Sequence, residues 1–452
     1  MPSVLAHAGR LLARRWPVLL AWMLGGTLVH FLALRLASFV GAASAVGGIL
    51  LLPLAALALL VAYVAMLLVL RPDMPRLAQL APLPDGERAR RISFLDGVLG
   101  GILPFVAFYA AWGFIREDVT TYINDASQWS SWWGLAAAAR LETYDTAGRI
   151  TDLGLNATTI GIVVLAFTGR WLYKRFAKRL PRRSGAAVFG VIAVYLEVLW
   201  VYLAVYVVSD LLGIVQTWIQ SRQAIVWLGD FRAGLTGWLA PFGVAWDGVE
   251  WLLGEAGGVI LLPVAWLTIA GVIYGQAVKA AAPRLAGARL RATRDRYAKL
   301  PARLRRRLAD IGASIVAPFR SIGAALILMW GAGPVVIAGY VLCFTLLAFA
   351  QQWALVGVGR AIGPQDVHQF WVPASVGVVA IVTVLFEPLR VALIAATYDR
   401  TVGALEDSSV ADAETHVEDV ALATDGDDDL VGASRVVTEE DRSDEVELRP
   451  GV

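Results

Sequence analysis

The stretch that decides the fold is Lys279–Arg320, KAAAPRLAGARLRATRDRYAKLPARLRRRLADIGASIVAPFR. It holds twelve Lys and Arg residues and only two acids, Asp295 and Asp310. Long apolar runs flank it, residues 257–278 before it and 322–349 after it. A loop this basic beside membrane spans stays on the cytoplasmic side. The stretch therefore predicts an integral membrane protein. Since successive spans cross the membrane in alternating directions, its cytoplasmic position predicts the orientation of every other span.

The composition agrees with a membrane protein. The 452 residues are 58% hydrophobic with a mean hydropathy of +0.63, above an average soluble chain. The apolar residues form runs of about 20, the length that crosses roughly 30 Å of hydrocarbon. We predict an all-α, polytopic transmembrane helix bundle with both termini in the cytoplasm, in the cell membrane. Its eight spans are 17–37, 46–70, 95–115, 157–174, a long span from 186, 257–278, 322–349 and 372–397.

Two features of individual spans leave alternatives open. The first run could be a cleaved secretory signal, since Ala43-Ser44-Ala45 resembles a cleavage site. Its length, and the second span directly after it, favour a membrane span.

The fifth span has no proline from Val191 to Leu228. As one helix it would be about 57 Å long, so it projects beyond the membrane or bends near Gly213.

The C-terminal residues 401–452 differ from the rest of the chain. They hold 16 Asp and Glu residues against three Arg, a net charge of −13. Such a segment cannot bury enough apolar surface to fold by itself. We expect an acidic, disordered cytoplasmic tail, and a protein partner would bind there.

The spans before the tail suggest an internal repeat. Residues 47–55 (GGILLLPLA) resemble residues 257–265 (GGVILLPVA) at an offset of 210. A first four-span half, 1–183, would then be followed by a second, 184–400, in the same orientation. The alternative is chance, because glycine and proline are frequent in membrane helices.

Two further patterns predict helices on the membrane surface. Apolar residues of the basic stretch recur at helical spacing between Leu304 and Phe319, and a cluster of arginines surrounds them. These arginines are candidate contacts for anionic lipids, and nucleic acid is not expected as a partner. The cluster is Arg303, Arg305, Arg306 and Arg307. Tryptophans gather in 123–141 and 217–256, which predicts short helices on the outer leaflet.

Catalytic and metal-binding signatures are absent from the sequence. There are four histidines and no His-Glu-x-x-His pair, and neither a Gly-x-Ser-x-Gly motif nor a phosphate-binding loop occurs. A single cysteine, Cys343, excludes a disulfide within the chain. We therefore predict a protein that is not an enzyme, with no catalytic residue, metal or cofactor.

Charges within the spans are the candidate functional residues. Glu197 lies about 14 residues after Arg183, roughly 21 Å along a helix and near mid-bilayer. Glu387, Arg390 and His30 also interrupt apolar runs. A charge at this depth must face protein or water. Either these residues line an ion or substrate path, or they form structural pairs: Glu387 with Arg390, and Glu197 with Arg390 first or with Arg35.

The last span ends Glu387-Pro388-Leu389-Arg390, followed by Thr397-Tyr398-Asp399-Arg400. This end resembles the close of a family of polytopic membrane proteins, some of which are labelled the membrane domain of glycerophosphodiester phosphodiesterases. The resemblance covers about 15 residues. It implies a helical membrane bundle without enzymatic activity, since that family's phosphodiesterase motif belongs to a separate domain that is missing here.

Together these features predict a non-enzymatic membrane bundle that is transporter-like or accessory to other membrane proteins. Membrane lipids are its expected surroundings. The alternative is a membrane scaffold that recruits partners through the acidic tail and the basic surface helices. A polar pocket at Glu197 and Glu387 would favour the first function, and a fully paired core would favour the second.

Overall fold

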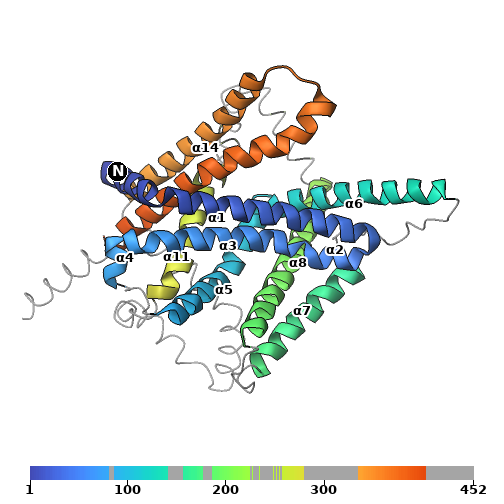
Figure 1. Cartoon of the computed structure of the whole chain (residues 1–452), viewed down its shortest axis with the longest axis horizontal. Coiled ribbons are helices and arrows are strands. Elements are labelled where there is room, and N and C mark those ends of the chain that lie inside the picture. The colour runs from blue at the N-terminus through green and yellow to red at the C-terminus, as the bar shows by residue number, and fades with distance from the viewer. Residues whose placement is uncertain are drawn as a thin grey trace, which may run out of the picture.

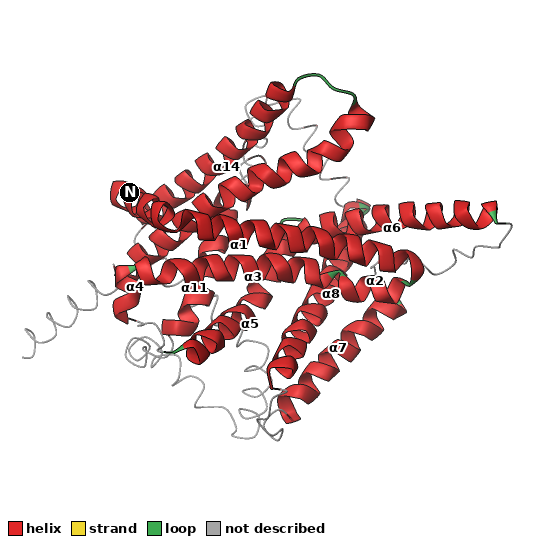
Figure 2. Cartoon of the chain, viewed as in Figure 1, coloured by secondary structure: helices red, strands yellow, loops and turns green. Residues whose placement is uncertain are grey.

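A computed structural model describes residues 1–80, 86–140, 156–176, 186–223, 257–278 and 334–403, with residues 227, 234, 248, 251 and 254. These residues are almost wholly helical and contain no strand, which confirms the all-α prediction (Figure 2). The basic stretch Lys279–Arg320 and the tail from residue 404 lie outside the described residues. The predictions for lipid contact at Arg303–Arg307 and for a disordered tail therefore stay predictions.

The first three helices form the long axis of the molecule (Figure 1). They are α1 (Pro2–Ala43), α2 (Ala45–Leu51) and α3 (Pro53–Leu70), and a 3₁₀ turn then leads to the short α4 (Pro75–Leu80). Pro53 occupies the first turn of α3, where its missing N–H costs no hydrogen bond. A Cβ on Gly26 of α1 would lie 2.4 Å from the Cβ of Ala62 on α3. Small residues thus let α1 and α3 pack closely.

The next two helices are α5 (Glu87–Ala111) and α6 (Phe114–Ala139). Pro104 interrupts the hydrogen-bond ladder of α5, and the helix bends there by 41°. Gly113 supplies the left-handed φ of 82° that turns the chain into α6. The outer segment predicted as a short interfacial helix over 123–141 is instead part of one 26-residue helix packed on α1.

A second hairpin, α7 (Ala157–Phe176) and α8 (Ala186–Gln220), diverges from the long axis (Figure 1). The 35 residues of α8 make a helix about 52 Å long. The helix passes Gly213 without a break. The structure therefore shows no break at Gly213, and projection beyond the membrane stays the prediction for this span.

The remaining helices are α11 (Leu262–Val278), entered through a π-helical turn at Gly257–Leu261, α14 (Pro334–Ile362), and a last helix, Val367–Gly403. The chain turns between the last two at Gly363, which has a φ of 81°. Of the predicted span 322–349, residues 322–333 lie outside the described residues, and the described helix continues past 349 to Ile362. The last helix also includes residues 401–403, which were assigned to the tail.

Five described helices are long and apolar enough to cross a membrane, and the bent α5 would make six. The five are Pro2–Ala43, Ala45–Asp73, Val194–Gln220, Val335–Ile362 and Val367–Gly403. Ala157–Leu172 and Val259–Tyr274 are shorter apolar helices at two further predicted positions. A helical protein with several membrane-length apolar helices is therefore shown, while the count of eight crossings and their orientation stay predictions.

Tyrosine hydroxyls join the predicted halves into one core. The Tyr274 hydroxyl on α11 donates to the carbonyl of Leu67 at 2.8 Å, and Tyr195 on α8 donates to the carbonyl of Leu50 at 2.6 Å. Helix α5 packs against both α8 and α11. Residues on both sides of the predicted boundary at 183/184 therefore share their packing, whether or not the halves arose as a repeat.

Candidate functional site

Asp118 on α6 is a buried acid, with 5% of its surface exposed. Its Oδ1 lies 3.4 Å from Nε2 of His30 on α1. Its Oδ2 accepts a hydrogen bond of 2.9 Å from the Tyr109 hydroxyl on α5. Three helices thus converge on one carboxyl group, and His30 has a partner that the sequence analysis did not identify.

Tyr122 fixes the position of α6 on α1. Its ring lies against Gly41 and Gly48, where an added Cβ would come within 2.5 Å and 2.4 Å of the Tyr122 hydroxyl oxygen. Only glycine leaves this space at the α1–α2 corner. Since Asp118 and Tyr122 are one turn apart on α6, the same contact holds Asp118 opposite His30.

Polar atoms around Asp118 are incompletely hydrogen-bonded. Tyr202 on α8 is fully buried and faces Asp118. Its hydroxyl makes no hydrogen bond with any described residue. Burying such groups without partners costs free energy, so native proteins retain them mostly where they have a functional or structural role. The surroundings of Asp118 are therefore a candidate functional site rather than a closed ion pair.

The α1–α6 contact continues outward through a second pair. Arg35 Nη1 lies 3.1 Å from Asp125 Oδ2, and the guanidinium lies 5.2 Å from the centre of the Phe31 ring. Beyond it, Phe39 packs edge-on against Trp129 at 5.4 Å. Arg35, the second partner considered for Glu197, therefore pairs with Asp125 on α6 instead.

The middle of the bundle holds Glu387 and Arg390, which form the ion pair that the sequence predicted. Only 4% of Glu387 is exposed. Arg390 also donates to the side-chain oxygen of Gln351 on α14 at 2.7 Å, and it lies 5.2 Å from the ring centre of Phe344. Tyr63 on α3 faces Glu387. The pair therefore binds the last helix to α14 and α3.

Glu197 pairs with Arg170 of α7, so the prediction of Arg390 as its partner was wrong. The Arg170 guanidinium also lies 5.1 Å from the centre of the Trp200 ring, one turn beyond Glu197 on α8. Arg170 belongs to the helix that precedes α8 in the chain, and such neighbours usually pack together. The contact thus closes the α7–α8 hairpin.

This pair gives a test within the hairpin. Glu197→Gln strands the Arg170 charge among apolar helices and should lower the free energy of unfolding by about 2–3 kcal/mol. Arg170→Met in the same chain should restore part of the loss, and Arg390→Met should not. Unfolding of the purified protein by sodium dodecyl sulfate measures each change. Rescue by Arg390→Met alone would contradict the observed pairing.

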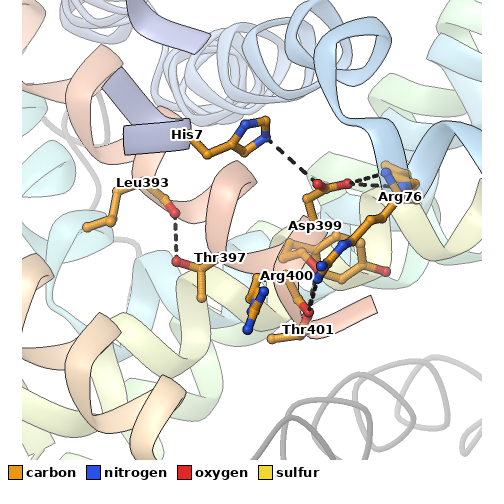
Figure 3. A network of polar contacts seen from close by, with 9 residues as sticks. His7, Arg76, Leu393, Thr397, Asp399, Arg400 and Thr401 are labelled. Carbon is orange, nitrogen blue, oxygen red and sulfur yellow. Dashed lines mark hydrogen bonds and ion pairs between the residues drawn. The ribbon is translucent and has the colours of Figure 1, made fainter. Parts of the chain in front are cut away.

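At the predicted cytoplasmic end, Asp399 connects three helices (Figure 3). Its Oδ1 accepts hydrogen bonds from the backbone N–H groups of Arg76 and Leu77, at 3.1 and 2.9 Å. Its Oδ2 lies 3.8 Å from Nε2 of His7 on α1. A carboxylate at the first turn of α4 satisfies free N–H groups and the helix dipole. The Tyr398-Asp399-Arg400 motif thus holds α4 and the start of α1 against the last helix.

The sequence-predicted site residues do not form one site. His30 lies with Asp118, Glu197 lies with Arg170, and Glu387 lies with Arg390. Tyr63 is the link among the described residues, because it interacts with Glu387 and its ring packs on Phe105 at 6.0 Å, which in turn stacks on Tyr109 at 5.6 Å. A row of polar and aromatic side chains therefore extends from Glu387 to Asp118 through the core.

The chemistry available to these groups is limited. Among the described residues no three His, Cys, Asp or Glu side chains gather as metal ligands would. Two shallow surface hollows lie elsewhere, one lined by Pro17, Val18, Ala21 and Trp22, the other by Asp210 to Ser221 of α8. Neither hollow is lined by Glu197, Glu387 or Asp118. The arrangement can hold charges and exchange protons, since its groups are carboxyl, imidazole and phenol.

The chain matches no protein-family model, no curated protein and no solved structure.

Proposed function

We propose that this chain is a non-enzymatic, multi-pass membrane protein of transporter-like type. The observation that carries the proposal is the set of ionisable side chains in the core, with Glu387 beside Tyr63, Asp118 bonded to Tyr109, and the Phe105 ring packed between the two tyrosines. Ionisable groups among apolar helices are costly, and in membrane proteins they mark ion and proton pathways. The partly unsatisfied surroundings of Asp118 support a role beyond packing.

A membrane scaffold is the second candidate. It is favoured by the Glu197–Arg170 and Glu387–Arg390 pairs, in which each charge is neutralised by a neighbour. Such pairs specify how helices pack and need not conduct anything. The acidic tail and the arginines of the basic stretch would then bind the partners.

Charge movement across the membrane distinguishes the two functions. Purified protein in liposomes, adsorbed on a solid-supported membrane, is exposed to jumps in proton, sodium, potassium or chloride concentration. We expect a transient current above that of protein-free liposomes for at least one ion. Asp118→Asn should remove it, and Asp125→Asn, which alters the neighbouring pair on the same helix, should leave it. The absence of current for every ion would contradict transport and favour the scaffold.

A further inference from the structure

Asp118 and His30 are the only described acid and imidazole that meet inside the α1–α5–α6 contact. Asp118 receives the Tyr109 hydroxyl on one oxygen and faces His30 Nε2 with the other. Tyr202 approaches from α8, and Glu117 is the nearest charge on α6 itself. No arginine or lysine among the described residues pairs with Asp118. This carboxyl group therefore differs from Glu197 and Glu387, each of which has an arginine.

The size of the site limits what it can bind. Tyr109, Tyr122 and Tyr202 are almost fully buried, and the described hollows of the protein lie away from them. A metal ion would need more carboxylate or imidazole ligands than the two present. A proton needs no cavity, only a base that can hold it. A carboxylate beside an imidazole supplies two such bases.

We propose that Asp118 and His30 form a proton-binding site inside the bundle. With one proton bound, the proton lies either on the Asp118 carboxyl or on the His30 imidazole. In the first case both groups are uncharged. In the second case they form an ion pair, and the net charge is zero in both. Release of the proton to water leaves a carboxylate beside a neutral imidazole, with a net charge of −1. A proton site here would serve the transporter-like function proposed above, and the role assigned to the site rests on that proposed function.

The electrostatics of Asp118 agree with this geometry. Helix α6 is not among the membrane-length apolar helices. Burial raises the pKa of the Asp118 carboxyl to about 7, and the Tyr109 hydroxyl acts in the opposite direction by bonding to the ionised form. The proton on this carboxyl would therefore exchange near neutral pH. The pair titrates as a unit, since two groups 3.4 Å apart cannot change charge independently.

Infrared spectroscopy of the purified full-length protein tests the site. The carbonyl stretch of a protonated carboxyl is followed while the pH is raised through neutrality. We expect a band that disappears near neutral pH, is missing in Asp118→Asn and is retained in the matched control Asp125→Asn. His30→Gln should move the midpoint to lower pH, because the one-proton form loses the state in which the proton lies on the imidazole. A band that is unchanged in Asp118→Asn would overturn the proposal.

Tyr109→Phe keeps the test valid if Asp118→Asn does not fold. This variant retains the ring and removes one hydrogen bond to the carboxylate, so the midpoint should rise, and an unchanged midpoint would refute the site. The result is separable from transport. A titrating Asp118 without charge movement would keep the proton site and end the transport proposal. Charge movement without a titrating Asp118 would keep the transport proposal and end the proton site.

Discussion

Glu387→Gln should lower the free energy of unfolding by about 3–5 kcal/mol, the cost of leaving one partner of a buried ion pair alone. Glu387 is 4% exposed, and its partner Arg390 is held against Gln351 and the Phe344 ring. Without the carboxylate charge, the guanidinium keeps only neutral amide oxygens as side-chain acceptors among apolar helices. Unfolding by sodium dodecyl sulfate, followed by circular dichroism, measures the loss.

A double variant shows whether the loss comes from the pair. Arg390→Met removes the stranded charge, so Glu387→Gln with Arg390→Met should be more stable than Glu387→Gln alone. The control is Glu87→Gln, which breaks the exposed pair with Arg91 on α5 and should change stability by less than about 0.5 kcal/mol. Equal stability of Glu387→Gln and Glu87→Gln would mean that the Glu387–Arg390 pair has no structural role.

Asp399→Ala should cost about 2–4 kcal/mol, because two backbone N–H groups of α4 lose their acceptor and the contact with His7 disappears. Asp399→Asn keeps a carbonyl oxygen for these donors, so its cost should be smaller. Protease cleavage of the α4 region should rise in the same order. A melting temperature unchanged by Asp399→Ala would show that the Asp399 contacts with α4 and α1 do not hold the helices together.

The sequence predicted the class of protein and the places of its apolar helices, because both follow from local composition. The Glu387–Arg390 pair was also predictable, since the two residues are one turn apart on the same helix. The pattern of the last span likewise drew attention to Asp399. Its role did not follow, because the N–H groups that it accepts are more than 300 residues away in the chain.

Contacts between helices were missed for specific reasons. Arg170 lies within the predicted span 157–174 but was not considered as a partner, and the tendency of consecutive helices to pack together was not applied to Glu197. The segment with Asp118 was assigned outside because its charges are mixed. A helical signal was nevertheless present there, since the buried face of α6 recurs at spacings of three and four. That face comprises Ile115, Asp118, Tyr122, Ala126 and Ser130.

The orientation predicted for every span depends on the basic stretch being cytoplasmic, and cysteine labelling tests that orientation directly. Single cysteines are placed in a Cys343→Ala chain and treated with an impermeant thiol reagent in intact cells. Gln128 and Gln365 are exposed and suit the outer positions, whereas Ser130 is buried and does not. Gln128→Cys and Gln365→Cys should react, and Asp85→Cys and Thr293→Cys should react only after the membrane is permeabilised. Labelling of Thr293→Cys in sealed cells would contradict the orientation predicted for every span.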